Sequence, residues 1–356
     1  MLTKIIHKTS HAYKLCHSRA KEGHLSTFRQ ICEITYLQAT QGIGYWHYHS
    51  ARMWHKDSKW RDKLNMLGSR QFVKRIFQLN QWKYHGVSQY KPFEKAYFKL
   101  FNIPTARHLG TFNQDWGVTE DGKPLKSKLD LKELLQKHIG EKVCFKMVVG
   151  HGGQGFKAFE IMENGTELMA HHLSTQQDYS LPELVNLLQD ENPAGWVIED
   201  YIQQHPGMAE FNPTSLNTIR MFVYENNQGE CVSLGSYLRI GAEGSLIDSL
   251  EGGGFGVEVD HRTGELIKDC IFCISDDHPL MFPDKDTATI KGNRIPFWKE
   301  AEEMGLKALR CYPNTRFLGL DISITEEGPV MIEMNILPSY LGLVWLRLKT
   351  KILLFQ

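Results

Sequence analysis

The sequence lacks the features of several classes of protein. Its 356 residues contain no run of about 18 apolar residues, so they offer no stretch for a membrane-spanning helix. The first residues soon become polar and lack the apolar stretch of a secretory signal, from which we expect a cytoplasmic chain. Cysteine is scarce, and seven scattered residues, an odd number, are typical of reduced thiols rather than of a disulfide framework.

The chain also lacks net charge, but its charges are unevenly distributed. Residues 1–99 contain 18 Lys and Arg against 5 Asp and Glu, a net charge of +13, and residues 100–356 carry the opposite charge. Such a basic segment could contact nucleic acid or an acidic membrane surface. It could equally be a helical layer whose cations face water or pair with the acidic remainder. No nucleic-acid motif is present, so we expect no nucleic-acid partner.

The order of apolar patterns predicts mixed sheets with flanking helices, an α+β or α/β layout. Residues 1–90 are mostly helical, with apolar spacing over 26–39. Helices are expected at 92–101, 130–138, 181–189 and 297–310. Strands are expected at 142–149, 156–161, 196–202, 216–225, 230–240 and 265–274, followed by a hairpin over 316–335 and a closing helix.

The hairpin over 316–335 places oxygen-bearing side chains on one face. Alternation in its first strand puts Leu318, Leu320, Ile322 and Ile324 on the apolar face. In the return strand it puts Val330, Ile332 and Met334 there. Asp321, Glu333 and Asn335 then share the opposite face, and two carboxylates with an amide oxygen suit Mg²⁺ or Mn²⁺. The alternative is that any exposed strand face is polar.

A second signal is a lysine strand that runs into a glycine-rich turn. Lys146 lies on the polar face of strand 142–149, which continues directly into a segment containing Gly150, Gly152, Gly153, Gln154 and Gly155. Backbone N–H groups in such a segment can close on phosphate oxygens, and the lysine adds a point charge. No helix follows, which excludes a Walker A loop and a Rossmann turn. The alternative is a tight turn.

Together these motifs resemble those of ATP-grasp enzymes, in particular the sugar-transfer-associated ATP-grasp family of bacterial polysaccharide gene clusters. The similarity extends from about residue 90 to 340. It implies two α+β subdomains that clasp ATP, preceded by an additional helical region, and magnesium held by Asp321, Glu333 and Asn335. The implied ATP contacts are Lys95, Lys146, Gly152, Gly153, Gln154, Gly155, Glu199, Asp200 and Ile202. In the base-binding strand, the Glu199 side chain and the Asp200 and Ile202 backbone would face adenine.

The resemblance implies a carboxylate–amine ligase that forms an acyl-phosphate, with Arg220 and Lys146 in catalytic roles. Its substrates would be ATP, a carboxylate and an amine, either small molecules or linked to a glycan of the cell surface. Arg220 has an alternative interpretation as an ordinary cross-strand ion pair. Two rival functions remain open: a kinase-like enzyme that phosphorylates a sugar hydroxyl, and a nucleotide-binding scaffold in glycan assembly.

A second glycine-rich stretch over 245–257 is the expected acceptor site, with Arg239, Asp248, Gly253 and Gly254 as candidate substrate residues. The alternative is a plain flexible loop. The last 16 residues are strongly apolar with interspersed cations, and either lie in a membrane interface or form a docked helix. The expected regions are 1–90, 91–203, 204–340 and 341–356.

Overall fold

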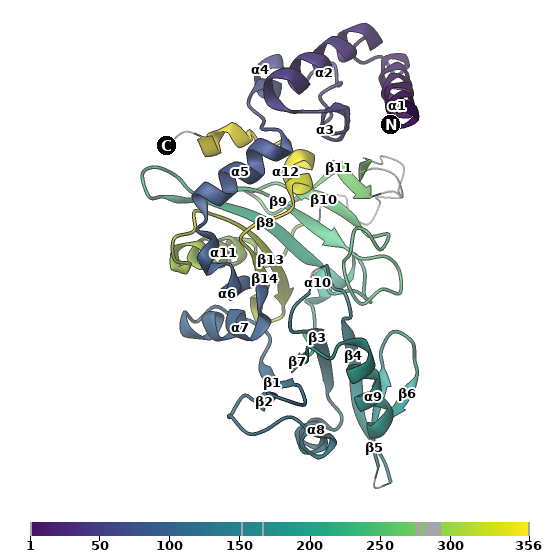
Figure 1. Cartoon of the computed structure of the whole chain (residues 1–356), viewed down its shortest axis with the longest axis vertical. Helices are drawn as coiled ribbons and strands as arrows, with labels where there is room; N and C mark the ends of the chain where they lie inside the picture. The colour runs from purple at the N-terminus through teal and green to yellow at the C-terminus, as the bar shows by residue number, and fades with distance from the viewer. Residues whose placement is uncertain (1, 151, 166, 275–278, 281–292, 355–356) are drawn as a thin grey trace.

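The computed structural model describes residues 2–150, 152–165, 167–274, 279–280 and 293–354. The molecule is elongated, with a layer of N-terminal helices at one end, the sheet formed within residues 218–335 in the middle and the sheet formed within residues 108–200 at the other end (Figure 1). The described part contains no helix that is long and apolar enough to cross a membrane.

The N-terminal layer is helical, as the sequence predicts. Its elements are α1 (Leu2–Lys21), α2 (Thr27–Gln41), α3 (Tyr45–Ser50), α4 (Trp60–Leu64), α5 (Ser69–Leu79), η1 (Trp82–Tyr84) and α6 (Gly86–Gln89). Helix α2 begins at Ser26, whose side chain accepts the N–H of Arg29, and ends at Gly42 with a φ of +70°. A small core that includes Leu37, Tyr48 and Val344 joins this layer to the C-terminal helix α12 (Tyr340–Trp345).

The first sheet is antiparallel and has the order β2-β1-β7-β3-β4-β5-β6. Its strands are β1 (His108–Phe112), β2 (Val118–Thr119), β3 (Lys142–Met147), β4 (Lys157–Asn164), β5 (Glu167–His172), β6 (Asp178–Ser180) and β7 (Trp196–Asp200). Helices α8 (Lys128–Leu135) and α9 (Leu181–Glu191) pack on it, and η2 (Gln136–His138) follows α8. Each of the two α-helices begins with a capping box, at Ser127 and at Ser180.

The second sheet has the order β12-β11-β10-β9-β8-β13-β14. Its strands are β8 (Thr218–Glu225), β9 (Cys231–Ile240), β10 (Phe255–Val259), β11 (Leu266–Ile274), β12 (Pro279–Leu280), β13 (Phe317–Thr325) and β14 (Gly328–Asn335). Helix α11 (Trp298–Cys311) covers one face, while α5 and α12 cover the other. The short α10 (Pro206–Ala209) follows the first sheet, and η3 (Thr350–Leu354) ends the described chain.

Helix α7 (Lys91–Leu100) packs against the second sheet. Phe98 is fully buried in the core of the second sheet, as is Ile103 just after the helix. Lys95 is therefore carried by a helix that packs on the second sheet, while its side chain points toward the strands of the first sheet.

The return strand of the hairpin departs from the predicted alternation. A β-bulge places Asp321 opposite Glu333 and Ile322 opposite Met331, so Ile332 is an extra residue. Met331 and Met334 are buried in the core, whereas Ile332 lines a cavity together with Glu333. The predicted apolar set of the return strand was wrong for Val330 and Ile332, because the bulge shifts the pleat by one residue.

The C-terminal segment is a docked element. Leu343, Val344, Trp345, Leu346 and Leu353 are all buried against the second sheet or the N-terminal layer. Of the two interpretations of this segment, the structure shows the docked helix, because the apolar side chains that a membrane would receive already lie in the protein core.

Candidate functional site

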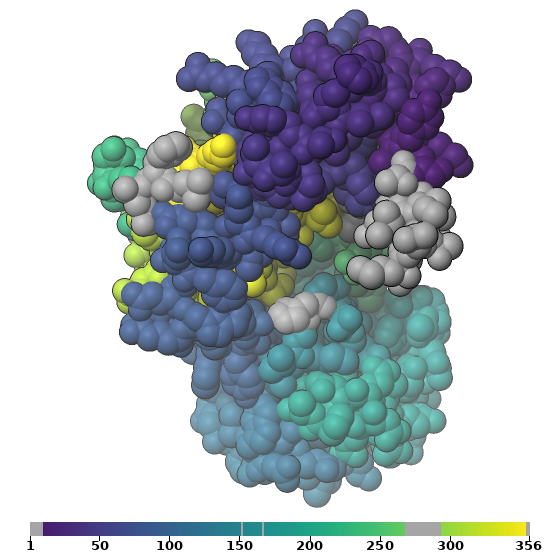
Figure 2. Space-filling model, turned by 45° about the horizontal axis from the view of Figure 1, so that its top comes forward, coloured from purple at the N-terminus to yellow at the C-terminus, as the bar shows by residue number. Residues whose placement is uncertain are grey.

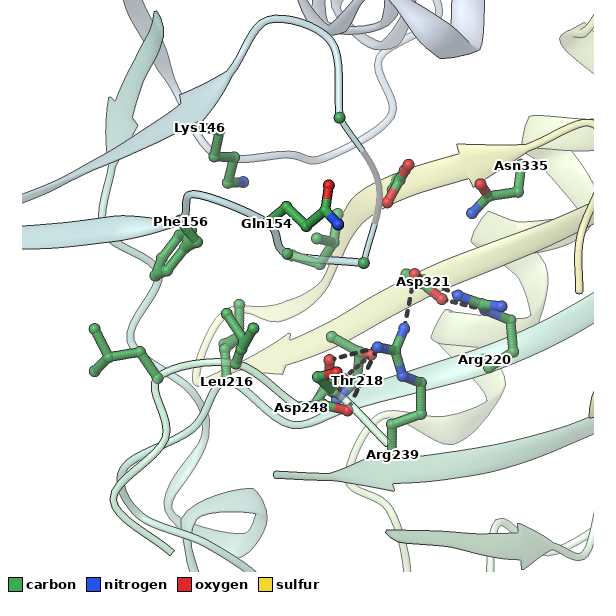
Figure 3. A pocket seen from close by; sticks show the side chains of 18 of the residues that line it. Lys146, Gln154, Phe156, Leu216, Thr218, Arg220, Arg239, Asp248, Asp321 and Asn335 are labelled. Atoms are coloured by element: carbon green, nitrogen blue, oxygen red, sulfur yellow. Dashed lines mark hydrogen bonds and ion pairs between the residues drawn. The ribbon is translucent and has the colours of Figure 1, made fainter. Parts of the chain in front are cut away.

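A cavity of about 330 Å³ lies where the two sheets meet. Figure 3 shows Lys146 of the first sheet and Gln154 of the glycine-rich turn facing Asp321 and Asn335 of the second sheet across it. Its size and its concentration of charged side chains are those of a small-molecule site.

Two lysines enter the cavity and share one buried carboxylate. The Glu199 side chain is fully buried, and its oxygens lie 2.7 Å from the Lys146 Nζ and 3.2 Å from the Lys95 Nζ. Burial acts to raise the pKa of Glu199, but the attraction of the two lysines outweighs it and lowers that pKa to about 2. Glu199 is thus an anion held between two cations.

The environments of the two lysines differ. Burial lowers the pKa of Lys95, whereas at Lys146 the attraction of Glu199 overcomes burial and raises the pKa. The Lys95 Nζ also donates to the Thr105 hydroxyl. Both cations are therefore fixed in position before any ligand arrives.

The glycine-rich turn closes one side of the cavity. Gly152, Gly153 and Gly155 all have positive φ values, which glycine adopts without strain. A Cβ added to Gly153 would lie 2.7 Å from the Cδ1 of Ile247. The Lys91 Nζ donates to the Gly150 carbonyl at 3.0 Å. This turn therefore touches the loop over 245–254 from the second sheet and is tied to α7.

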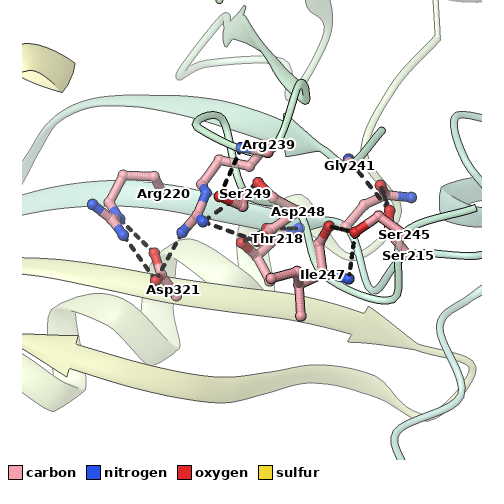
Figure 4. Close-up of polar contacts among 12 residues, drawn as sticks. Ser215, Thr218, Arg220, Arg239, Gly241, Ser245, Ile247, Asp248, Ser249 and Asp321 are labelled. Atoms are coloured by element: carbon pink, nitrogen blue, oxygen red, sulfur yellow. Dashed lines mark hydrogen bonds and ion pairs between the residues drawn. The ribbon is translucent and has the colours of Figure 1, made fainter. Parts of the chain in front are cut away.

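Two arginines grip Asp321 on the opposite wall (Figure 4). Asp321 lies opposite Arg220 in the sheet and accepts two bonds from its guanidinium, one of them at 2.8 Å. The Arg239 Nη1 donates to the same carboxylate at 3.1 Å. Burial acts to raise the pKa of Asp321, but the two guanidinium groups lower it overall. The predicted cross-strand ion pair of Arg220 exists, and it lies within the cavity wall.

Asp248 extends this network into the glycine-rich loop. Its carboxylate accepts the Thr218 N–H at 3.1 Å and also the Thr218 hydroxyl, and it pairs with the Arg239 Nη2 at 2.9 Å. Burial raises the pKa of Asp248. With its oxygens already bonded, Asp248 positions Arg239 and fastens the loop to β8.

The three side chains predicted to hold magnesium come from the neighbouring strands β13 and β14. Glu333 lies opposite Asp321 in the sheet, Asn335 lies opposite Gly319, and all three oxygen-bearing side chains line the same cavity. The carboxyl group of Glu94 also lies near Glu333. Burial, and then the negative charge of Glu333, raise the pKa of Glu94 well above its usual value.

Within the described residues, no group of three or more His, Cys, Asp or Glu is arranged to hold a metal by itself. Magnesium commonly takes one or two protein carboxylates and completes its shell with phosphates and water. The carboxylate of Asp321, one of the three predicted ligands, is already bonded by two guanidinium groups.

The structure brings most of the predicted site residues together. Those that line the cavity are Lys95, Lys146, Gly152, Gly153, Gln154, Glu199, Asp200, Ile202, Arg220, Arg239, Asp248, Asp321, Glu333 and Asn335. Gly155, Gly253 and Gly254 are not among its lining residues: Gly155 packs on Met147, and Gly254 lies close to the Ile240 backbone. The expected contact of the Glu199 side chain with adenine differs from its observed bonding to two lysines.

The lining residues that the sequence analysis did not single out include Lys91, Glu94, Ile247 and Trp345. Glu94 is buried and its Oε1 accepts the Met334 N–H at 2.6 Å, which fixes α7 to β14. The position of Glu94 directly before Lys95 was the signal in the sequence that could have identified it. Trp345 gave none, because only the packing of α12 brings it to the cavity.

Solved structures resemble this chain at low sequence identity. N5-carboxyaminoimidazole synthetase from Staphylococcus aureus, complexed with ADP, is 11% identical with a TM-score of 0.43, over 78% of this chain and 53% of that one. Biotin carboxylase from Campylobacter jejuni is 13% identical with a TM-score of 0.42, over 75% and 46%. D-alanine-D-alanine ligase from Coxiella burnetii is 10% identical with a TM-score of 0.38, over 71% and 49%.

These matches span about half the length of each solved chain. No curated protein matches the sequence significantly. A family model described as sugar-transfer associated ATP-grasp matches residues 94–344, which is more than half of the chain. The chain therefore belongs to the sugar-transfer associated ATP-grasp family.

Proposed function

We propose that this protein is an ATP-dependent carboxylate–amine ligase that forms ADP and acts on a surface polysaccharide or its precursor. The substrates we infer are a uronic acid or another sugar carboxylate, and an amino acid or another amine. The observation that supports this proposal most is the single cavity in which two lysines and two arginines face the carboxylates of β13 and β14.

The cations of the cavity suit the transfer of a phosphoryl group. Phosphoryl transfer depends mainly on positioning and on neutralising the phosphate charge. Lys95 and Lys146 would bind phosphate oxygens beneath the glycine-rich turn, and their ion pairs with Glu199 hold both in place beforehand. Arg220 would stabilise the oxyanion of the acyl-phosphate, with Asp321 orienting its guanidinium.

The bond changes in the proposed reaction balance. A substrate carboxylate oxygen attacks the γ-phosphorus, the bond from that phosphorus to the bridging oxygen breaks, and ADP leaves. The amine then attacks the acyl carbon, phosphate leaves with the bonding pair, and the amine loses a proton to form the amide. Glu333 and Asn335, with the remaining capacity of Asp321, would hold Mg²⁺, which supplies charge neutralisation on the phosphates when bound.

The test is the release of ADP from ATP in the presence of a panel of uronic acids and amino acids. We expect release that requires both a carboxylate and an amine. Release of AMP and pyrophosphate, or turnover without an amine that leaves a stable phosphoester, would contradict a ligase; the second outcome indicates the kinase-like alternative. Nucleotide binding with no turnover in any mixture would indicate the scaffold.

A matched pair of variants on β3 ties the activity to this cavity. Lys146→Ala removes a lysine whose Nζ pairs with Glu199 inside the cavity, whereas Lys142→Ala removes an exposed one from the same strand. We expect the first variant to lose turnover and the second to retain it. Equal activity of the two variants would show that the reaction takes place elsewhere. We also propose a cytoplasmic site of action, where ATP is available.

A further inference from the structure

Helix α2 presents apolar side chains to water. Phe28 is 79% exposed, Ile31 41% and Tyr36 51%, and Cys32 is exposed beside them. These positions are spaced by three and four residues, so they form one stripe along the helix. A helix of a soluble domain ordinarily turns such a stripe inward.

The opposite face of α2 is the buried one, and it is largely polar. Gln30, Glu33, Leu37 and Gln41 are the buried residues of the helix. The Gln30 amide donates to the Cys16 carbonyl at 3.0 Å and to the Leu25 carbonyl at 2.6 Å. In α2 the usual arrangement of an amphipathic helix is therefore reversed: polar side chains are buried and apolar side chains face water.

Buried bonds fix this orientation of α2. Glu33 accepts the hydroxyl of the buried Tyr48 at 2.7 Å and pairs with Lys63, whose side chain is 1% exposed. Rotating the helix to bury Phe28 would expose or break these bonds, and a buried ion pair that loses one partner leaves the other charge uncompensated. The apolar stripe is therefore held outward by the interior of the layer.

The stripe continues onto α4 and is flanked by cations. Trp60 is 37% exposed, and its ring lies 5.5 Å from that of Tyr36, centroid to centroid. We call Phe28, Ile31, Cys32, Tyr36 and Trp60 the α2 patch. Four exposed basic residues neighbour its members in the chain, Arg29, Lys56, Lys59 and Arg61, against two acids, the exposed Asp57 and Asp62, which pairs with Lys349.

The α2 patch lies far from the cavity along the chain's long axis. Helix α2 is at the helical end of the molecule in Figure 1, while β3 and β4, which lead into and out of the glycine-rich turn, lie toward the other end. Figure 2 shows the same layer, in purple, as one outer end of the molecule. A surface bound there would leave the cavity open to its ligands.

We propose that the α2 patch docks on an anionic lipid membrane. Aromatic and aliphatic side chains with flanking Lys and Arg are the combination that partitions into the headgroup region and is attracted by acidic lipids. Residues 1–64, which form α1 to α4 at this end of the molecule, contain 11 Lys and Arg against 4 Asp and Glu, and the net charge of +7 has the sign complementary to acidic lipids. This inference does not depend on the proposed reaction, since its test measures binding to lipid.

The experiment is co-sedimentation of the full chain with vesicles. Vesicles of phosphatidylcholine that contain about 30% phosphatidylglycerol should bind the protein. Vesicles of phosphatidylcholine alone should bind about tenfold less or not at all. Raising the salt from about 0.1 M to about 1 M should reduce the binding, because it shortens the screening length to about 3 Å.

Matched variants test whether the α2 patch is the contact. Phe28→Ser with Tyr36→Ser should lower vesicle affinity about tenfold or more, whereas Leu129→Ser, at a 66% exposed position on α8, should leave it unchanged. Lys59→Glu with Arg61→Glu should also lower it. Its control is a charge reversal at two exposed lysines far from the patch, Lys128 and Lys137. Thermal melting checks that each variant is folded.

Three results would overturn the proposal. The first is equal affinity for neutral and anionic vesicles, and the second is unchanged binding by the Phe28 and Tyr36 double variant. The third is a dimer in sedimentation velocity that this double variant converts to a monomer, which would show that a second copy of the chain covers α2.

Discussion

Replacing Glu199 by Gln isolates the charge that holds the two cavity lysines together. The substitution keeps the shape of the side chain and removes its negative charge. Lys95, 5% exposed, and Lys146, 16% exposed, would then face each other without a shared anion. Two like charges in a largely desolvated position repel, so the folded state should lose stability.

The size of the loss follows from the pKa of Glu199. Its fall from the usual 4.5 to about 2 corresponds to roughly 3 kcal/mol of stabilisation at neutral pH. Breaking buried ion pairs by removing one partner costs about 3–5 kcal/mol, which agrees. Since a domain is stable by only about 5–15 kcal/mol, the variant should be markedly weakened.

Urea unfolding of the ligand-free protein at pH 7 measures this loss. Glu191→Gln is the matched control, because Glu191 also pairs with a lysine but is 38% exposed, and we expect it to cost under about 1 kcal/mol. ADP should raise the melting temperature of the Glu199 variant at least as much as that of the natural protein, because its phosphates replace the lost anion between the lysines. A Glu199 variant as stable as the Glu191 control would refute the reasoning.

The same carboxylate gives a pH dependence with a definite sign. Because folding lowers the pKa of Glu199, its contribution is present above about pH 4.5 and is lost as the pH falls toward about 2. The unfolding free energy of the natural protein should therefore decline over that window, and the difference from the Gln variant should shrink with it.

Three further predictions concern the glycine-rich turn and the acidic groups. Gly153→Ala should weaken ADP binding in calorimetry more than Gly152→Ala, because both have positive φ but only Gly153 abuts Ile247; equal losses would exclude that contact as the cause. Glu333→Ala should abolish ADP release while the melting temperature changes by under about 5 °C, and an active variant would contradict a role in holding Mg²⁺. Asp248→Asn should cost about 2 kcal/mol in urea unfolding through its buried bonds, and an unchanged midpoint would argue against them.

Alternation along the chain predicted the cavity face of β13 correctly. Leu318, Leu320 and Ile322 are buried in the core, and Asp321 points the other way into the cavity, as a period of two requires. The same rule failed in β14, because an extra residue at Ile332 interrupts the ladder. A bulge is decided by pairing with β13, which no local pattern reports.

Several strands were missed for a related reason. The segment Glu167–His172 forms β5, although nothing in its short sequence separates a strand from a helix. Its pairing with β4 decides the matter. The first strand, His108–Phe112, is likewise held by β7: His108 pairs with Glu199, 91 residues further along the chain, and no local pattern reports such a pairing.

The sequence by itself determined the chemistry: the types of charged group, their order along the chain and the strands that hold most of them follow from local patterns and spacing. Tertiary structure alone decided how those charges are shared, placing Glu199 between two lysines and Asp321 between two arginines. It also turned the apolar stripe of α2 outward, through the pairing of Glu33 with Lys63 thirty residues away. The physical reason is that burial and ion pairing depend on which distant segments meet, and local periodicity carries no information about that.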